Sequence, residues 1–242
     1  LINSLDKQKY KNWQALFVDG KSNEKHKSFL KESIKTYSNF SYIEQGSNSK
    51  GIYGAMNDGI KYSKDFDYVL FWGSDDFCSD DDIFGKIIKF INQSENNMPD
   101  ILLFKASYFN ESNNKFLRES LLLNKIKFLN SKTINRLIFL GNSPAHQATI
   151  FNSKLIYNNY FYNTDYRLAA DLELFLRLIS NENILLTNSN INIVNLGNKG
   201  ISNSFTLNRL KEVISIYFKY FGLFCIFPFF LRYWKRLNSK KF

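Results

Sequence analysis

One acidic pair in the sequence has the residue types and position for chemistry. Asp75 and Asp76 follow an unbroken apolar run at residues 68–72, which is typical of a central strand buried on both faces. Ligands of open α/β sheets bind beyond the carboxyl ends of the strands, so two carboxylates there could hold a divalent cation that clamps a diphosphate. Alternatively, the pair caps the next turn or helix, beside the solvated acids at 80–82.

Two further carboxylates stand at the ends of predicted elements. Asp171 lies in the first turn of a predicted helix, where an N-cap role would suffice to explain it. The helix is indicated by apolar residues at helical spacing, namely Leu172, Phe175, Leu176 and Ile179. Asp19 closes a predicted strand and is followed by Gly20, a dipeptide that also fits a plain turn.

Alternating strands and helices must position these side chains. The apolar patterns predict strands at residues 13–19, 40–44, 68–72, 99–107, 184–187 and 191–196. They predict helices at residues 1–11, 24–37, 51–63, 80–90, 133–140 and 171–179, and a glycine-containing loop at 197–202. This order indicates the α/β class, with a mixed, mostly parallel sheet flanked by helices.

The composition indicates one folded α/β core. The chain has 242 residues with 44% hydrophobic and 17% aromatic content, enough for one sizeable core. Six positive charges follow Glu212 without any acidic residue, so more than half of the net charge of +10 lies in the last thirty or so residues. Cys78 and Cys225 lack metal-ligand spacing, and lone cysteines are typical of a reducing compartment.

The C-terminal segment is amphipathic and then basic-aromatic. Residues 207–221 have an apolar helical face, and residues 221–231 are almost wholly apolar around Pro228. This run of about eleven residues is short of the roughly twenty that a spanning helix needs. The segment fits an anionic membrane interface, or alternatively a helix packed on the core. Nucleic acid is not expected as a partner, because we find no recognisable binding motif.

The acidic pair and the helix before it together resemble a known family. Residues 51–60 read GIYGAMNDGI and precede a strand that ends in Ser74-Asp75-Asp76, which is similar to the donor-binding half of family 2 glycosyltransferases. The resemblance implies a GT-A-like domain at residues 1–205, followed by the tail at 206–242. Gly73 departs from the family pattern at its first acidic position. The family would also place one more strand before Leu1.

The resemblance implies roles for individual residues. The donor would be held by Asp19, Gly51, Tyr53, Asn57 and Asp75, and Mg or Mn by Asp75 and Asp76. Asp171, with Arg177 in the same helix, matches the general base, since an attacking acceptor hydroxyl must lose its proton. His146 and Gln147 would line the acceptor side, although a lone histidine beside a strand is often structural.

The implied function is metal-dependent, inverting sugar transfer. The donor would be a nucleotide-sugar, most simply a UDP-sugar, and the acceptor a glycan or lipid-linked glycan, as in bacterial O-antigen or capsule assembly. The enzyme would be cytoplasmic and bound to the inner face of the plasma membrane. One alternative is a non-catalytic GT-A-like module that binds a partner transferase or the membrane. Another is a nucleotidyltransferase, but that class needs a glycine-rich basic phosphate loop, which we do not find.

Overall fold

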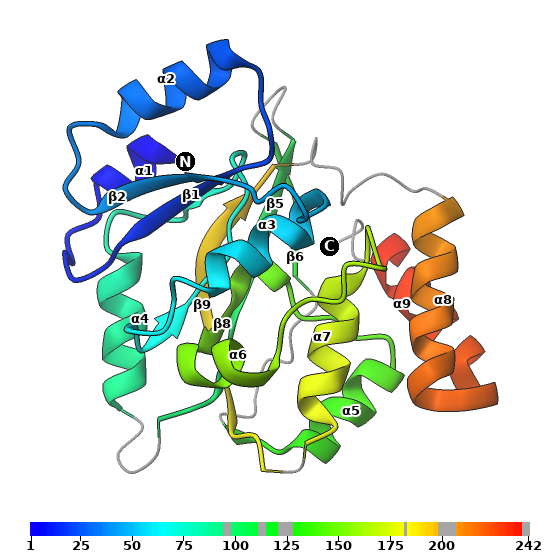
Figure 1. Ribbon diagram of the computed structural model, residues 1–242. Coiled ribbons are helices and arrows are strands. Elements are labelled where there is room, and N and C mark those ends of the chain that lie inside the picture. The colour runs from blue at the N-terminus through cyan, green and yellow to red at the C-terminus, as the bar shows by residue number, and fades with distance from the viewer. Residues whose placement is uncertain (94–97, 111–114, 121–127, 182, 198–206, 239–242) are drawn as a thin grey trace.

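The computed structural model describes residues 1–93, 98–110, 115–120, 128–181, 183–197 and 207–238 (Figure 1). A two-stranded sheet contains β1 (Ala15–Asp19) and β2 (Phe40–Glu44). The main sheet has the order β3 (Tyr68–Val69), β8 (Thr149–Asn152), β5 (Ile101–Asn110), β9 (Leu186–Leu196) and β4 (Phe77–Cys78). Two further strands extend it, β6 (Lys115–Glu119) on β5 and β7 (Phe128–Leu129) on β9.

The α/β class and the mixed sheet are confirmed, but the expectation of mostly parallel pairing is wrong. Among the described strands, β1–β2 and β5–β9 are parallel. The antiparallel pairs are β3–β8, β4–β9, β5–β6, β5–β8 and β7–β9. Short connections allow this pairing: only residues 111–114 separate β5 from β6, whereas a parallel crossover needs a dozen residues or more.

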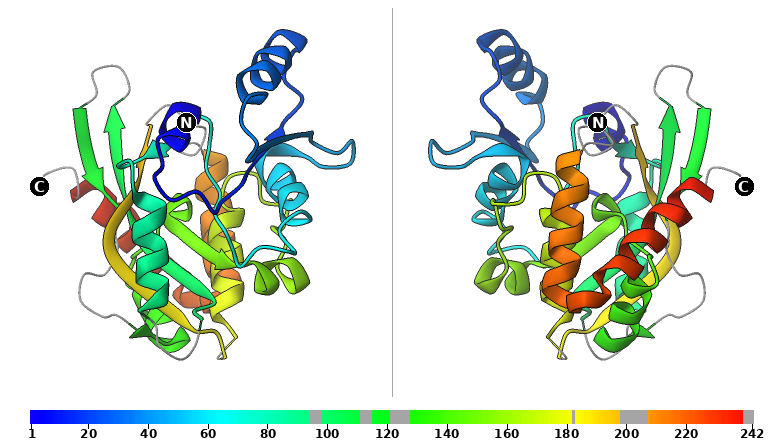
Figure 2. Two further views of the ribbon diagram at one scale, coloured as in Figure 1. Left: turned by 90° about the vertical axis from the view of Figure 1, so that its left-hand side faces the viewer. Right: turned by 90° about the vertical axis from the view of Figure 1, so that its right-hand side faces the viewer.

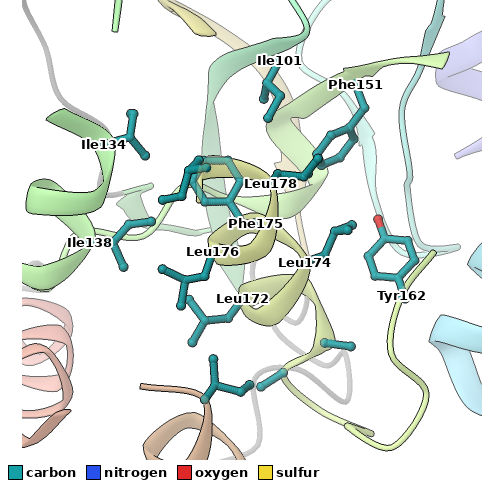
Figure 3. Close-up of a cluster of buried hydrophobic side chains, with 14 of the residues drawn as sticks. Ile101, Ile134, Ile138, Phe151, Tyr162, Leu172, Leu174, Phe175, Leu176 and Leu178 are labelled. Atoms are coloured by element: carbon teal, nitrogen blue, oxygen red, sulfur yellow. The ribbon is translucent and has the colours of Figure 1, made fainter. Parts of the chain in front are cut away.

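Helices cover both faces of the main sheet. α4 (Ile83–Asn92) packs on one face, and Leu102 and Phe104 of β5 point toward it. Ile101 and Leu103 point to the other face, as the two-residue period of a strand requires. That face is covered by α3 (Gly51–Ile60), α5 (Ser131–Phe139), α6 (Ser153–Asn159) and α7 (Ala170–Ile179). Figure 3 shows the α7 side chains between those of α5 and the sheet, with Tyr162 at the edge of the cluster.

The apolar run at 68–72 is explained by these two covered faces. Val69 and Phe71 pack into the cluster around α7, whereas Tyr68, Leu70 and Trp72 pack into the cluster around α4. The strand is nevertheless not central, because β3 ends the strand order and its ladder includes only Tyr68 and Val69. The run is apolar because each face meets a core, not because strands flank it on both sides.

Most predicted elements are present with small shifts of their ends. α1 (Ile2–Asp6) and α2 (Glu24–Ile34) are shorter than predicted. The strands predicted at 184–187 and 191–196 are a single strand, β9, whose register against β5 shifts midway. The loop predicted at 197–202 lies outside the described residues except for Gly197.

The C-terminal segment folds back on itself and packs on the core. α8 (Leu207–Phe221) is followed by a 3₁₀ turn (Gly222–Cys225) and by α9 (Ile226–Asn238), and the two helices form a hairpin (Figure 2). Val213, Ile216 and Tyr217 are buried in the same cluster as α7, so a boundary after residue 205 does not separate two cores. Within the described residues, Leu207–Asn238 is long and apolar enough to cross a membrane, although here it is bent into two helices.

Candidate functional site

A cavity of about 610 Å³ lies between the carboxyl end of β1 and the N-terminal half of α3. On the side of β1 the cavity is lined by Val18 and Gly20, the two neighbours of Asp19. On the side of α3 it is lined by Gly51 and Ile52, the first residues of that helix. Its other lining residues are Lys21, Gln45, Ser49, Lys50, Ala55 and Arg167. A cavity at the carboxyl end of a strand is where α/β folds bind nucleotides.

Of the predicted donor residues, Gly51 lines this cavity, and Asp19 lies between two lining residues, Val18 and Gly20. Asp19 is buried, and its Oδ2 accepts a hydrogen bond from the backbone N–H of Ser22 at 3.0 Å. Gly51 begins α3 with a φ of +65°, in the left-handed region that favours glycine. The side chain of Gln45 holds this turn, since its Nε2 donates to the carbonyl of Gly51 at 2.8 Å.

Three cationic side chains line the cavity, and the sequence patterns did not identify them as site residues. Lys21, Lys50 and Arg167 all border it, and such a set complements a diphosphate. Lys21 has a φ of +68°, which is uncommon for a residue with a side chain. Arg167 lies more than a hundred residues from the other two, so no local pattern could have identified it.

Asp171 lies at a second point, where α3 meets α7. The hydroxyl of Tyr53 donates to Asp171 Oδ1 at 3.1 Å, although 118 residues separate the two. Tyr53 is buried, and its ring stacks on Tyr162 at 5.4 Å between centroids. The predicted donor residue Tyr53 therefore orients the predicted base, and its donor contact stays a prediction.

The electrostatic surroundings keep Asp171 ionised. Burial alone would raise the pKa of this carboxyl, but the positive charges of His146, Arg209 and Arg232 outweigh it and lower the pKa below its usual value. Burial also lowers the pKa of His146, so its imidazole is neutral near pH 7. At that pH the two arginines, both from the C-terminal hairpin, stabilise the carboxylate.

The predicted residues Asn57, His146 and Gln147 are held by protein partners. Asn57 exchanges two hydrogen bonds with the backbone of Tyr162, at 2.9 and 2.7 Å. His146 Nε2 lies 2.5 Å from the hydroxyl of Tyr162, and its ring stacks on Phe71. The carbonyl of Gln147 accepts from the indole N–H of Trp72 at 2.8 Å. The contacts of His146 and Gln147 hold Phe71 and Trp72, which come just before the acidic pair. The ligand contacts of Asn57, His146 and Gln147 stay predictions.

The acidic pair occupies one tight turn after residue 72. Asp75 is exposed, whereas Asp76 is 3% exposed and its Oδ2 accepts from the backbone N–H of Gly73 at 2.6 Å. Burial, together with the charge of Asp75, raises the pKa of Asp76 to about 7. The two carboxylates converge, because a Cβ at Gly73 would lie 2.8 Å from Asp75 Oδ1 and 3.4 Å from Asp76 Oδ2.

This donor set fits a cation shared with a ligand. Within the described ranges, no group of three or more His, Cys, Asp and Glu side chains is placed to hold a metal ion. Mg²⁺ is, however, usually bound by one or two carboxylates, with substrate phosphates and water completing its shell. Asp75 and Asp76 would supply those two hard oxygen ligands, and a glycine at position 73 leaves room between them and the backbone.

A family model and a curated protein both match parts of this chain. The family model described as glycosyl transferase family 2 matches residues 1–161. A poly(ribitol-phosphate) beta-glucosyltransferase from Bacillus spizizenii is 32% identical over 99 residues, which cover 41% of this chain and 15% of that protein. The chain therefore spans only a small part of this curated relative.

Solved structures share the fold. S. aureus TarS 1–349 superimposes with a TM-score of 0.69 at 17% identity, over 100% of this chain and 69% of that one. The same protein in complex with UDP gives 0.65 at 19% identity, over 90% and 59%. The mannosyltransferase PcManGT from Pyrobaculum calidifontis, in complex with GDP-Man and Mn²⁺, gives 0.61 at 11% identity, over 95% and 64%. The fold is thus the GT-A fold, and the match over residues 1–161 shows that this chain belongs to glycosyltransferase family 2.

Proposed function

We propose that this chain transfers a sugar, with inversion, from a nucleotide-sugar to a hydroxyl of a glycan or lipid-linked acceptor. Asp171 removes the proton of the attacking hydroxyl, and the donor is most simply a UDP-sugar. The reaction belongs to the synthesis of a bacterial surface polysaccharide such as O-antigen or capsule. The protein would act in the cytoplasm, at the inner face of the plasma membrane.

The hydrogen bond between Tyr53 and Asp171 is the observation that carries this proposal. It joins the helix that begins at the cavity to the helix that bears the carboxylate. A general base must be held within reach of the reacting hydroxyl and must be ionised before the proton transfer. The Tyr53 hydroxyl supplies the orientation, and the charges of Arg209 and Arg232 favour the ionised form.

The cavity beside Asp19 is the proposed nucleotide site. Lys21, Lys50 and Arg167 supply positive charge for the diphosphate, and Gly51 would border the base or ribose. Asp19, which lies between the lining residues Val18 and Gly20, would contact the same part of the donor. The fold relative from S. aureus was solved in complex with UDP, which supports a uridine nucleotide. Asp75 and Asp76 would hold Mg or Mn, which when bound neutralises the charge that develops on the leaving diphosphate.

The first test is calorimetric titration of UDP into the whole chain, once with Mn²⁺ and once with EDTA. We expect binding with Mn²⁺ and at least about tenfold weaker binding with EDTA, because the ion bridges carboxylate and phosphate. Asp75→Asn should abolish the difference between the two conditions, whereas Asp65→Asn, an exposed aspartate outside the cavity lining, should preserve it. A folded protein that binds UDP in neither condition would contradict the proposal.

A non-catalytic module is the second candidate, and one observation favours it. Gly73 replaces the first acidic residue of the metal motif, so the turn offers two carboxylates rather than three. Such a module would bind no UDP but would still bind a membrane or a partner transferase. The same titration therefore separates the two candidates.

The C-terminal hairpin is the proposed membrane contact. Its exposed apolar side chains gather on the turn and on one face of α9: Leu223, Phe224, Ile226, Phe227, Phe230, Trp234 and Leu237. Lys235 and Arg236 follow in the same helix, and this pairing of aromatic and basic residues suits an anionic lipid surface.

Point substitutions test this contact better than removal of the tail, because Cys225 and Arg232 are buried in the core. The triple variant Phe224→Ser, Phe227→Ser, Phe230→Ser should lose co-sedimentation with phosphatidylglycerol vesicles. The matched control is Phe29→Ser, whose side chain is 70% exposed on α2. Equal vesicle binding by both variants would assign the attachment elsewhere.

A further inference from the structure

Helix α3 has two faces with different contacts. Tyr53 and Asn57, which the resemblance implies as donor contacts, do not belong to the lining of the cavity. Successive residues of an α-helix are rotated by about 100°, so these two side chains lie on one side of α3 and the lining residues on the opposite side. The lining residues of this helix are Gly51, Ile52 and Ala55.

The side chain of Asn57 bonds both backbone polar groups of Tyr162. Its Nδ2 donates to the carbonyl of Tyr162 at 2.9 Å, and its Oδ1 accepts from the N–H at 2.7 Å, although 105 residues separate the two. Residues 160–169 contain no helix or strand, so their backbone groups need partners from elsewhere. The carbonyl of Phe161 accepts from Arg177 Nη2 at 2.6 Å. These bonds hold the segment that leads into α7.

The side chain of Tyr162 is enclosed on several sides. It is 3% exposed, and its ring stacks on Tyr53 at 5.4 Å and meets Phe71 edge-on at 5.7 Å between centroids. Its hydroxyl lies 2.5 Å from His146 Nε2. Burial raises the pKa of Tyr162, so the hydroxyl keeps its proton. Tyr162 therefore joins α3, the segment before the acidic pair and the turn that contains His146.

This series of contacts ends at Asp171. The hydroxyl of Tyr53 donates to Asp171 Oδ1 at 3.1 Å, and it can hold the carboxylate in one orientation only if the ring of Tyr53 is itself held. The stack on Tyr162 supplies that support. Asn57 fixes the backbone of Tyr162, Tyr162 fixes the ring of Tyr53, and Tyr53 orients Asp171.

Packing alone does not explain why position 162 has a hydroxyl. A phenylalanine would make the same ring contacts with Tyr53 and Phe71, without the cost of burying a polar group. The hydroxyl instead pairs with His146. Polar pairs that are fully satisfied inside a protein fix a single arrangement of their neighbours. Such an arrangement is useful where a carboxylate must meet a reacting hydroxyl.

We propose that Asn57 and Tyr162 are positioning residues for Asp171 and not contacts of the donor. This inference rests on the proposed function, because it takes Asp171 as the base. One helix then serves both substrates: the face with Gly51 borders the proposed nucleotide site, and the face with Asn57 sets the position of the base. Loss of either positioning residue should slow turnover without weakening nucleotide binding.

The first test needs no ligand and uses the two histidines of the chain. In spectra of ¹⁵N-histidine-labelled protein, His146 reports on Tyr162, and His26, exposed on α2, is an internal control. Tyr162→Phe should move the ring nitrogen signals of His146, because it removes the partner of Nε2. Asn57→Ala should move them as well, because it releases Tyr162. The signals of His26 should stay in place in both variants.

The second test separates nucleotide binding from turnover. UDP is titrated with Mn²⁺ into each variant, and turnover is followed as release of UDP from UDP-glucose or UDP-N-acetylglucosamine, with water as the acceptor. We expect kcat to fall about threefold to tenfold in Tyr162→Phe and about tenfold or more in Asn57→Ala, with the Kd for UDP changed less than about twofold. The matched control is Tyr68→Phe, which removes a hydroxyl that donates to the carbonyl of Pro99 at 3.0 Å and should change neither quantity.

A double variant shows whether the effect passes through Asp171. Tyr53→Phe combined with Tyr162→Phe should lower kcat by less than the product of the two single losses, because both act on the same carboxylate. A loss of activity through general destabilisation would multiply instead. Thermal melts check folding, and Tyr162→Phe, which keeps the ring and the backbone bonds, carries the test if Asn57→Ala does not fold.

Three results would overturn the inference and leave the proposed function in place. Weaker UDP binding by Asn57→Ala or Tyr162→Phe than by Tyr68→Phe would make that residue a donor contact. Turnover equal to that of Tyr68→Phe, or losses that multiply with Tyr53→Phe, would show that the residues do not act through Asp171. Unmoved His146 signals in Asn57→Ala would show that Asn57 does not hold Tyr162.

Failure of the proposed function would look different. A wild type that binds no UDP, or that releases none from either sugar nucleotide, would remove the role of Asp171 as a base. The positioning role would fall with it, even if the His146 spectra showed the contacts of Tyr162 intact.

Discussion

The carboxylate of Glu212 accepts a hydrogen bond from the backbone N–H of Arg167 at 3.0 Å, although 45 residues separate them. Its second oxygen accepts from the N–H of Leu168 at 2.8 Å. Glu212 belongs to α8, and Arg167 lines the cavity proposed to bind the nucleotide. The C-terminal hairpin thus holds the loop that brings a cation to the proposed diphosphate site, in addition to supplying the arginines beside Asp171.

Glu212→Gln should therefore weaken donor binding. The amide keeps the shape of the side chain but offers one oxygen to two N–H donors, so one charge-assisted hydrogen bond is lost. We expect the KM for the nucleotide-sugar to rise about fivefold, equivalent to about 1 kcal/mol, with a smaller change in kcat. Steady-state kinetics measure both. Glu32→Gln, at an exposed site on α2, is the control, and an equal effect of both variants would contradict the role of Glu212.

The contact between Tyr53 and Asp171 predicts a graded pair of variants. Asp171→Asn removes the base and should lower kcat by about two to four orders of magnitude, with UDP binding unchanged. Tyr53→Phe removes only the orienting hydrogen bond, and because a bond to an ionised group is worth about 1.5–3 kcal/mol, kcat should fall about tenfold or somewhat more. Wild-type turnover in Asp171→Asn would show that the proton leaves by another route.

The lowered pKa of Asp171 predicts the acidic limb of the pH profile. A general base acts only when ionised. With saturating Mn²⁺, which when bound favours the ionised form of Asp76 over its raised pKa, kcat/KM should therefore stay level as the pH falls and should decline only below about pH 4, the ordinary aspartate range. Arg209→Gln removes one of the charges that lower this pKa, so its limb should move to higher pH. Initial rates measured from about pH 3.5, roughly half a unit below the ordinary aspartate pKa, up to about pH 8 define both curves. A wild-type limb near pH 6 would exclude Asp171 as the titrating base.

Local patterns in the sequence predicted the parts of the site but not their connections. The helical spacing after Asp171 was sufficient to predict α7, and the apolar face at 207–221 predicted α8 with its observed bounds. The burial of Asp76 beside the exposed Asp75 could not be read from two adjacent aspartates. The contacts of Glu212 and Arg232 depend on how the hairpin folds back, and such distant pairs leave no periodic signal.

Gly141 is where the hairpin depends most on a single residue. It ends α5 with a φ of +82°, and a Cβ there would lie 2.5 Å from the carbonyl carbon of Leu231 and 2.6 Å from the nitrogen of Arg232. Gly141→Ala must therefore displace α9 as well as strain the backbone. Gly222 has a φ of +56° and no atom within 4 Å of such a Cβ, so Gly222→Ala tests backbone strain alone.

We expect Gly222→Ala to lower the free energy of unfolding by about 1 kcal/mol, the cost of the left-handed conformation, and Gly141→Ala to lower it by a further 1–3 kcal/mol or so. Urea denaturation measures both. Equal losses of stability would show that the close packing of α9 against Gly141 does not stabilise the fold. Another contact would then have to hold Arg232 near Asp171.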